Sequence, residues 1–566
     1  MATAEQPTKK IPAGSKSLVE NHLYYGDNLE VLKLHVKDES VDLVYLDPPF
    51  NSARNYNVLF EEKDGSKSAS QIKAFDDTWR WDQGAALAYE EVVLAGGRVS
   101  DVMRAFRTFL GETDMLAYLA MMAPRLVELR RVLKPTGSLY LHCDPTASHY
   151  LKLLLDAVFG PDKFVSEIIW KRATPHNDAK RWSPVHDSIL YYSRGDSLTW
   201  NPQYDAHSEA YLDSKYRHKD PDGRIFRLDN MTSPNPRPNM TYEWKGHASP
   251  ANGWRYSRET MANLDADGRI WYPDVKSKRP QLKRYLDEMP GSVMTDVWTD
   301  ISPINSQAQE RLGYPTQKPQ VLLERIIAAS SNKGDVVLDP FCGCGTTIEA
   351  ALSLGRTWIG IDVTHLAITL IKNRIQDAYE GKAAYTVIGE PTSIADAEEL
   401  AATDKYQFQW WALGLVGARP LDQKKGADKG IDGQLLFHGG ASPGDIHRAI
   451  FSVKAGHLKA GEVRDLVGTV QREGAQIGVL ISFEQPTKQM RAEAASHGFY
   501  HSLWGNHPKI QLITVGELLD GKTVDMPRTS GINKTFKAAP KATGPKEVKA
   551  PKKRVPAKKT DQHDLL

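Results

Sequence analysis

Cysteine is scarce in this chain, with three residues in 566, at Cys143, Cys342 and Cys344. Three thiols provide neither a disulfide framework nor the ligands of a zinc finger, so we expect the reducing interior of a cell, the cytoplasm. No run of eighteen apolar residues occurs, which predicts no membrane-spanning helix and no membrane partner. Residues 1–20 are polar and lack the apolar stretch of a secretory signal, and we expect them to be disordered.

An excess of charge of one sign is also lacking, because the formal net charge is only +2. Any surface that binds a polyanion must therefore come from local clusters of basic residues. The chain is too long for one ordinary domain. Its composition, 41% hydrophobic and 25% charged, is that of a globular protein.

The sequence DPPF at 47–50 carries the first chemical signal. The apolar run 41–46 is typical of a buried parallel strand, and Asp47 follows at its carboxyl end, where open α/β sheets bind ligands. Pro48 and Pro49 turn the backbone stiffly out of the sheet. An exocyclic amine on a nucleic-acid base is a poor nucleophile, and acceptors on its two N–H groups would restore its lone pair. The Asp47 carboxylate and the Pro48 carbonyl are the candidate acceptors, and Phe50 could stack on the base. The alternative is an ordinary strand-to-turn junction with an Asp cap.

A glycine-interrupted loop carries the second signal. The sequence predicts a strand at 335–339, a loop with Gly343 and Gly345, and a helix from 348 to 354. The glycines would let the backbone approach a nucleotide-like cofactor, and Asp362, after the strand 357–361, is placed to bind ribose hydroxyls. The pattern is neither GxGxxG nor a Walker loop, which disfavours NAD and ATP. The alternative is a strand–loop–helix without a ligand. The predicted cofactor-binding residues here are Asp339, Pro340, Phe341, Gly343, Gly345, Thr346, Thr347 and Asp362.

Together these motifs resemble a beta-class amino DNA methyltransferase, in which the DPPY/F half precedes the FxGxG half. YPTQKP at 314–319 resembles that family's motif ten, and the segments 133–145 and 164–194 resemble its strand after the catalytic loop and its base-pocket segment. The resemblance covers about residues 20–380. It implies that S-adenosylmethionine is the cofactor and that Lys318 joins the cofactor-binding residues. It also implies methyl transfer to the amino group of adenine in double-stranded DNA, with amino-cytosine left open.

The implied fold class is α/β, with a doubly wound, mostly parallel sheet in permuted motif order. The catalytic and cofactor strands would lie side by side, so that base and cofactor meet at their carboxyl ends. An adenine within a duplex would have to be flipped out to reach that point.

Two regions concentrate basic residues. Residues 196–312 are rich in Arg, Lys, Trp, Tyr and Asn, and their position matches the family's target-recognition region. We expect most of their aromatic residues to be structural. The tail from 526 to 566 is dense in lysine and is predicted to be disordered, as a DNA-holding or merely solubilising segment.

The pattern restarts near residue 386 as a second, small α/β domain. GADKGIDG and the later strand with VK resemble the Mrr-like branch of restriction-endonuclease-like domains, in which Asp and [E/Q]xK hold a divalent ion. Asp432 and Lys454 match the Asp and the Lys, but Ser452 replaces the Glu or Gln and is a weak metal ligand. Asp428, Glu398 or Glu399 could compensate. An active nuclease using Mg²⁺, an inactive DNA-binding remnant and a plain accessory domain remain open.

For the whole chain we expect a site-specific adenine methyltransferase in a restriction-modification or defence system, acting as a homodimer or with a restriction or defence partner. The alternatives are an amino-cytosine enzyme, a bifunctional methyltransferase-endonuclease and a DNA-binding module without turnover. The predicted segments are a disordered amino terminus (1–20), a catalytic half (21–195), a target-recognition region (196–312), a cofactor-binding half (313–385), a nuclease-like domain (386–525) and a basic tail (526–566).

Overall fold

The structure of this chain is a computed structural model. It describes residues 20–49, 81–174, 182–305, 308, 310–312, 314, 316–421, 430–439, 445–527 and 541. Phe50, Asp428 and almost all of the predicted basic tail lie outside the described residues. Among the described residues, 202–295 form one compact unit and the rest belong to a second unit.

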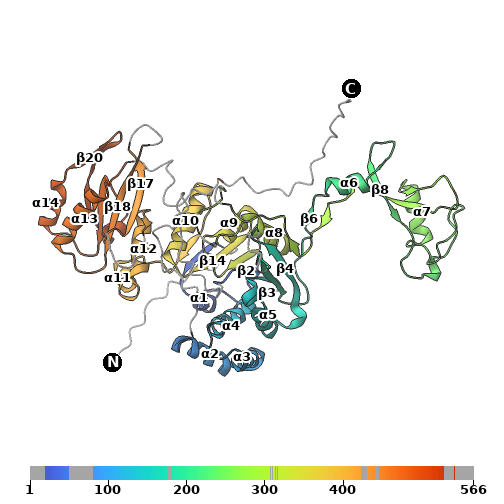
Figure 1. The fold of residues 1–566 in the computed structure, drawn as a ribbon, viewed down its shortest axis with the longest axis horizontal. Coiled ribbons are helices and arrows are strands. Elements are labelled where there is room, and N and C mark those ends of the chain that lie inside the picture. The colour runs from blue at the N-terminus through green and yellow to red at the C-terminus, as the bar shows by residue number, and fades with distance from the viewer. Residues whose placement is uncertain are drawn as a thin grey trace, which may run out of the picture. The chain divides into compact units, whose positions relative to one another are not determined.

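A nine-stranded sheet organises the larger unit (Figure 1). Its strand order is β12-β4-β5-β3-β2-β13-β14-β1-β15, and β5 is the one strand that runs antiparallel to its described neighbours, β3 and β4. The strands are β1 (His22–Tyr25), β2 (Val41–Leu46), β3 (Leu133–Cys143), β4 (Phe164–Lys171), β5 (His186–Ser193), β12 (Val297–Trp298), β13 (Val336–Asp339), β14 (Thr357–Asp362) and β15 (Thr386–Ile388). The predicted fold class, a doubly wound and mostly parallel sheet, is confirmed.

Helices cover both faces of this sheet, because most of its strands are apolar on both sides. One core lies between the sheet and α1 to α5, and the other between the sheet and α8 to α10 (Figure 1). The helices are α1 (Asn28–His35), α2 (Gln83–Ala95), α3 (Gly97–Leu110), α4 (Asp114–Val132), α5 (Pro145–Phe159), α8 (Gln320–Ser330), α9 (Thr346–Ser353) and α10 (His365–Tyr379), with a 3₁₀ turn, η1, at Pro161–Lys163.

Local sequence chemistry sets the ends of α5. The Asp144 carboxylate accepts hydrogen bonds from the backbone N–H groups of Thr146 (3.0 Å) and Ala147 (3.2 Å), which have no partner within the helix. Pro145 occupies the first helical position, where its missing N–H costs nothing, and Gly160 ends the helix with φ of 108°. The Asp144 carboxylate, which follows β3 as Asp47 follows β2, is thus used as a helix cap.

Residues 202–295 fold around a small aromatic core of their own. Trp254 is fully buried with Met231, Met261 and Leu282. This agrees with the expectation that the aromatic residues here are largely structural. The elements are β6 (Tyr204–Asp205), α6 (Glu209–Lys215), β7 (His218–Lys219), β8 (Ile225–Asn230), η2 (Pro238–Met240), α7 (Arg258–Ala266), β9 (Ile270–Trp271), β10 (Gln281–Tyr285), η3 (Leu286–Glu288) and β11 (Ser292–Val293).

A five-stranded sheet, in the order β16-β17-β18-β19-β22, forms the carboxyl-terminal region. Strands β18, β19 and β22 are parallel, whereas β17 is antiparallel to both of its neighbours. The elements are α11 (Ile394–Thr403), α12 (Lys405–Leu415), β16 (Arg419–Pro420), β17 (Gly433–His438), β18 (Ile446–Lys454), α13 (Ala460–Arg472), β19 (Ile477–Ser482), α14 (Lys488–Ser496), β20 (Phe499–Ser502), β21 (Gly505–Pro508), β22 (Ile510–Thr514) and α15 (Val515–Leu519). Across the described parts of the chain, no helix has both the length and the apolar character needed to cross a bilayer.

Candidate active site

The two predicted motifs follow neighbouring strands. Strand β2 pairs in parallel with β13, with Leu43 opposite Val337 and Val44 opposite Leu338. Asp47 and Asp339 therefore stand at the same edge of the sheet, although they are nearly three hundred residues apart in the chain. Since ligands of open α/β sheets bind at the carboxyl ends of the strands, this edge is the candidate active site.

Asp47 has one engaged and one unengaged carboxylate oxygen. Lys318 donates from Nζ to Oδ2, and the side chains of Asp47 and Lys318 are 15% and 13% exposed. Oδ1 is buried and has no hydrogen-bond partner among the described residues. A buried acceptor without a donor is costly, so Oδ1 is suited to receive an N–H group from a ligand. The structure shows the ammonium group of Lys318 on Asp47. The predicted role of Lys318 in binding the cofactor stays a prediction.

A buried hydrogen-bonded chain lies beside Asp47 and was missed in the sequence. The Tyr45 hydroxyl meets His142 Nδ1 at 2.9 Å, and His142 Nε2 lies 3.2 Å from Asp187 Oδ2. Arg172 forms an ion pair with the other oxygen of Asp187 at 2.6 Å. Burial opposes ionisation of Asp187, but the hydrogen bond from His142 and the nearby positive charges hold its pKa below the ordinary value. These hydrogen bonds connect β2, β3 and β5 next to the end of β2 that carries Asp47.

The loop after β13 has the backbone shape that glycine permits. Gly343 and Gly345 have φ of 48° and 75°, and Gly345 N donates to the Cys342 carbonyl at 2.7 Å. A Cβ on Gly343 would lie 3.3 Å from the Tyr314 ring, and one on Gly345 would lie 2.8 Å from Ile371. A side chain at Gly345 would therefore clash with Ile371, and one at Gly343 would require the Tyr314 ring to shift slightly.

Two buried carboxylates accept hydrogen bonds from this loop and from the residues next to it. Asp339 accepts hydrogen bonds from Phe341 N (3.0 Å) and from the Thr347 hydroxyl (2.5 Å). Asp362 accepts from Gly343 N (2.9 Å) and from the backbone N–H of Thr364 (2.9 Å). Burial raises the pKa of Asp339 to about 7 and that of Asp362 to about 6.

Arg374 supports the same loop from α10. Its guanidinium pairs with Glu349 inside the core and donates to the Cys344 carbonyl (3.0 Å) and the Thr346 hydroxyl (3.2 Å). The hydroxyl of Thr346, a predicted cofactor ligand, is thus engaged within the protein. Arg374 is only 3% exposed. A single Arg on the apolar face of the helical pattern 365–379 was the signal in the sequence that could have identified it.

Asn28 fixes the backbone between Asp339 and Phe341. Its side-chain amide donates to the Pro340 carbonyl at 2.7 Å, and its Oδ1 accepts from Arg125 Nε at 2.6 Å. Arg125 also pairs with Asp27 at 2.5 Å. No local sequence pattern indicates this contact, because Asn28 and Pro340 are 312 residues apart.

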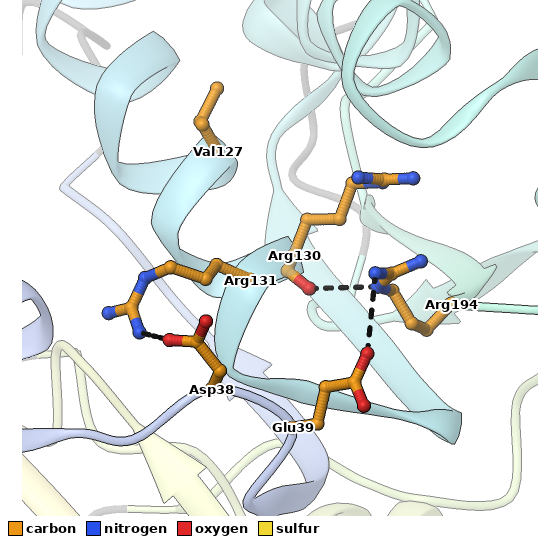
Figure 2. Close-up of a pocket in the computed structure, with 6 residues that line it drawn as sticks. All are labelled: Asp38, Glu39, Val127, Arg130, Arg131 and Arg194. Carbon is orange, nitrogen blue, oxygen red and sulfur yellow. Dashed lines mark hydrogen bonds and ion pairs between the residues drawn. The ribbon is translucent and has the colours of Figure 1, made fainter.

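A surface cavity of about 460 Å³ lies away from these motifs (Figure 2). It is lined by residues that precede β2, end α4 and follow β5, and none of the described residues predicted for catalysis or cofactor binding lines it. Figure 2 shows that Arg131 pairs with Asp38 and that Arg194 contacts Glu39 and the Arg130 carbonyl. The cavity therefore lies by the amino-terminal end of β2, opposite to the end that carries Asp47.

The residues predicted for the nuclease-like motif do not form a clear set of metal ligands. Asp432 is buried, and its Oδ2 accepts a hydrogen bond from Val453 N at 2.6 Å. Ser452 is also buried, and Lys454 ends β18. Glu398 and Glu399 lie on the exposed side of α11. Within the described residues, no group of three or more His, Cys, Asp or Glu side chains is arranged to hold a metal ion.

Comparison with known proteins shows the family to which this chain belongs. The family described as DNA methylase (N6_N4_Mtase) matches residues 41–373, more than half of the chain. The Type II methyltransferase M.EcaI of Enterobacter cloacae is 31% identical over 364 residues, covering 64% of this chain and 70% of that protein. The chain belongs to this family of DNA methylases, with an amino group of adenine (N6) or cytosine (N4) as the family's target.

Other similarities cover smaller shares of the compared proteins or are more distant. The Mod subunit of the Type III restriction-modification enzyme StyLTI of Salmonella typhimurium is 26% identical over 389 residues, and the match spans 64% of this chain and 54% of that protein. The solved M1.HpyAVI–SAM complex is 16% identical, with a TM-score of 0.28, over 62% of this chain and 98% of that one.

The carboxyl-terminal region matches a different family. The family described as NACHT-associated inactive Restriction Endonuclease 1 matches residues 406–520. A restriction-endonuclease-like domain is therefore present, and the family it matches is an inactive one. The narrower prediction of an Mrr-like domain stays a prediction.

Proposed function

We propose that this chain transfers a methyl group from S-adenosylmethionine to the exocyclic amino group of adenine in double-stranded DNA. The unpartnered, buried Oδ1 of Asp47 is the observation that carries the proposal. It stands at the end of β2, beside the strand that leads into the glycine loop. The membership of the chain in the DNA methylase family supports the same reaction.

The loop fits the proposed cofactor. Gly343 has a backbone conformation that a side chain would strain, and an added Cβ would press on the Tyr314 ring at 3.3 Å, so glycine is needed for this loop shape. The residues that would hold the cofactor are those of the loop from Asp339 to Thr347, together with Asp362. When bound, S-adenosylmethionine supplies an electrophilic methyl group.

Asp47 would activate the target amine. Oδ1 would accept one N–H of the amino group, which keeps the nitrogen lone pair out of the ring, and the Pro48 carbonyl would accept the other. Lys318 keeps Oδ2 engaged, so the carboxylate presents a single oxygen in a fixed orientation. After methyl transfer, the nitrogen is left with one proton in excess, and the Asp47 carboxylate would accept it. Phe50, outside the described residues, is proposed to stack on the flipped base.

Adenine is preferred over cytosine because the motif begins with Asp. The cytosine-amino enzymes of this type more often have Ser in that position, as the resemblance to the family implies. The alternative reaction, N4 methylation of cytosine, uses the same geometry. Nucleoside mass spectrometry of DNA from a methylation-deficient host that expresses this chain distinguishes them. We expect N6-methyldeoxyadenosine; N4-methyldeoxycytidine alone would refute the choice of base.

Residues 202–295 are proposed to read the DNA sequence, within the target-recognition region predicted at 196–312. A partner from a restriction or defence system is also proposed, supported by the similarity to a Type III Mod subunit. The prediction of a homodimer stays a prediction.

Cofactor affinity should depend on pH. The pKa values of Asp339 and Asp362, about 7 and about 6, are raised by burial, so both groups lose their negative charge as the pH falls through these values. S-adenosylmethionine carries a net positive charge, so the ionised carboxylates favour it. We expect its affinity, measured by calorimetry, to fall about tenfold or more from pH 8 to pH 5.5. By the same linkage, the contribution of these two carboxyl groups to the stability of the fold without cofactor should fall as the pH rises from 4 to 7.

S-adenosylhomocysteine is the matched control ligand for this titration, because it lacks the sulfonium charge. Its affinity should change much less over the same range. Equal pH profiles for the two ligands would contradict the role of the two carboxylates.

The nuclease-like domain is proposed to bind nucleic acid or a protein partner without cutting. Ser452 replaces the metal-binding carboxylate or amide, and one oxygen of Asp432 is engaged by the backbone of β18. Mg²⁺ is therefore not proposed as its cofactor. We expect plasmid DNA that is incubated with the purified chain and Mg²⁺ or Mn²⁺ to remain intact. It should be as intact as in control samples that contain a chelator. Divalent-dependent cutting that is lost in Asp432→Ala would show an active nuclease instead.

A further inference from the structure

Helix α12, the helix with which the match to the inactive nuclease family begins, has two buried faces. Gln407, Trp410 and Gly414 are spaced by three and four residues and so share one face. Phe408 and Trp411 share the other face and belong to the core of the nuclease-like domain. The two adjacent tryptophans thus point into different hydrophobic clusters.

Trp410 packs against the cofactor-binding half. It is 7% exposed, and its cluster contains Leu312, Cys344 and Leu370, with Tyr314 packed against it. Cys344 lies between the two loop glycines. Tyr314 is the residue whose ring lies against Gly343, as the 3.3 Å distance to an added Cβ shows. The indole therefore shares one hydrophobic cluster with a residue of the glycine loop and with the ring that lies against Gly343.

Two further contacts hold α12 on α10. Gln407 Oε1 accepts a hydrogen bond from His365 N at 3.0 Å, at the start of α10 and three residues after Asp362. This N–H belongs to the first turn, where helices lack internal acceptors. Gly414 permits close packing, since a Cβ there would lie 2.7 Å from the Thr369 hydroxyl oxygen.

We propose that Trp410 and Gln407 are positioning residues for cofactor binding, through which the nuclease-like domain sets the affinity of the methyltransferase for S-adenosylmethionine. The inference rests on the proposed role of the loop from Asp339 to Thr347. Removal of the indole leaves a gap in the hydrophobic cluster that contains Cys344 and against which Tyr314 packs, so the loop samples conformations that do not bind. By reciprocity, cofactor binding stabilises the docking of α12. If a ligand of this domain changes the affinity for the cofactor by some factor, the cofactor changes the affinity for that ligand by the same factor.

The test uses the full chain and calorimetric binding of S-adenosylmethionine, which needs no DNA and no turnover. Trp410→Leu should raise the Kd about tenfold or more, and Trp410→Phe should restore it to within about threefold of wild type. Trp411→Leu is the matched control, with the same substitution on the other face, and should leave the Kd within about twofold. Gln407→Ala, which leaves the hydrophobic clusters unchanged, should raise the Kd about threefold.

The outcomes separate the two proposals. No binding by the wild-type chain would overturn the proposed function and this inference with it. Tight binding by wild type together with an unchanged Kd in both Trp410→Leu and Gln407→Ala would overturn the inference alone. Equal weakening in Trp410→Leu and Trp411→Leu would also overturn it, because it would show a general loss of folding.

Discussion

Asp47→Ala should reduce the rate of methyl transfer at least about a thousandfold, while the Kd for S-adenosylmethionine changes less than about threefold. The substitution removes the one carboxylate oxygen that is buried without a hydrogen-bond partner among the described residues. It changes no residue of the loop from Asp339 to Thr347. Asp47→Asn should be nearly as inactive, because its amide is uncharged and a much weaker acceptor for the proton of the product. The measurement is single-turnover transfer of labelled methyl groups, with calorimetry for cofactor binding.

Asp144→Asn is the matched control for this experiment. Asp144 follows β3 as Asp47 follows β2, but its carboxylate caps α5 through Thr146 and Ala147. The control should lose some stability, about 1 kcal/mol or less, and keep its single-turnover rate. Comparable loss of activity in both variants would indicate that any carboxylate at this edge matters structurally, and it would remove the special role of Asp47.

Gly343→Val should weaken cofactor binding at least about thirtyfold, or about 2 kcal/mol. The φ of 48° disfavours a β-branched residue, and a Cβ would lie 3.3 Å from the Tyr314 ring. Both effects change the loop where its backbone is proposed to contact the cofactor. Calorimetric Kd values for S-adenosylmethionine measure the loss directly, and saturation with cofactor should recover part of the activity.

Gly334→Val provides the control for backbone strain. Gly334 also has a positive φ, 88°, but an added Cβ there would meet no atom of the described residues within 4 Å. It precedes β13, at the opposite end of the strand from the loop. We expect similar destabilisation in thermal unfolding but an unchanged Kd. A normal Kd in Gly343→Val would refute the proposed position of the cofactor.

The main features of the methyltransferase fold could be predicted because they are local in sequence. Short apolar runs predicted the strands at 41–46, 335–339 and 357–361, and the structure confirms them as β2, β13 and β14. The pairing of β2 with β13 is long-range, but the rules of doubly wound sheets and the resemblance to a known family were sufficient to predict it.

Several contacts around the site could not be predicted, since they depend on side chains brought together from distant segments. Asn28 reaches the Pro340 carbonyl, and Lys318 reaches Asp47. Trp410 and Trp411 are indistinguishable by hydropathy, and only the docking of α12 on α10 shows which of them joins the hydrophobic cluster of the cofactor-binding half. The predicted catalytic and cofactor-binding roles stay predictions until variants are measured.

The most direct test is a crystal structure of the chain with S-adenosylhomocysteine and a DNA duplex that contains its recognition site. The account predicts the cofactor product on the loop from Asp339 to Thr347, and a flipped adenine whose amino nitrogen lies about 3 Å from Asp47 Oδ1. A base held away from Asp47, or a cofactor product bound at another edge of the sheet, would contradict it.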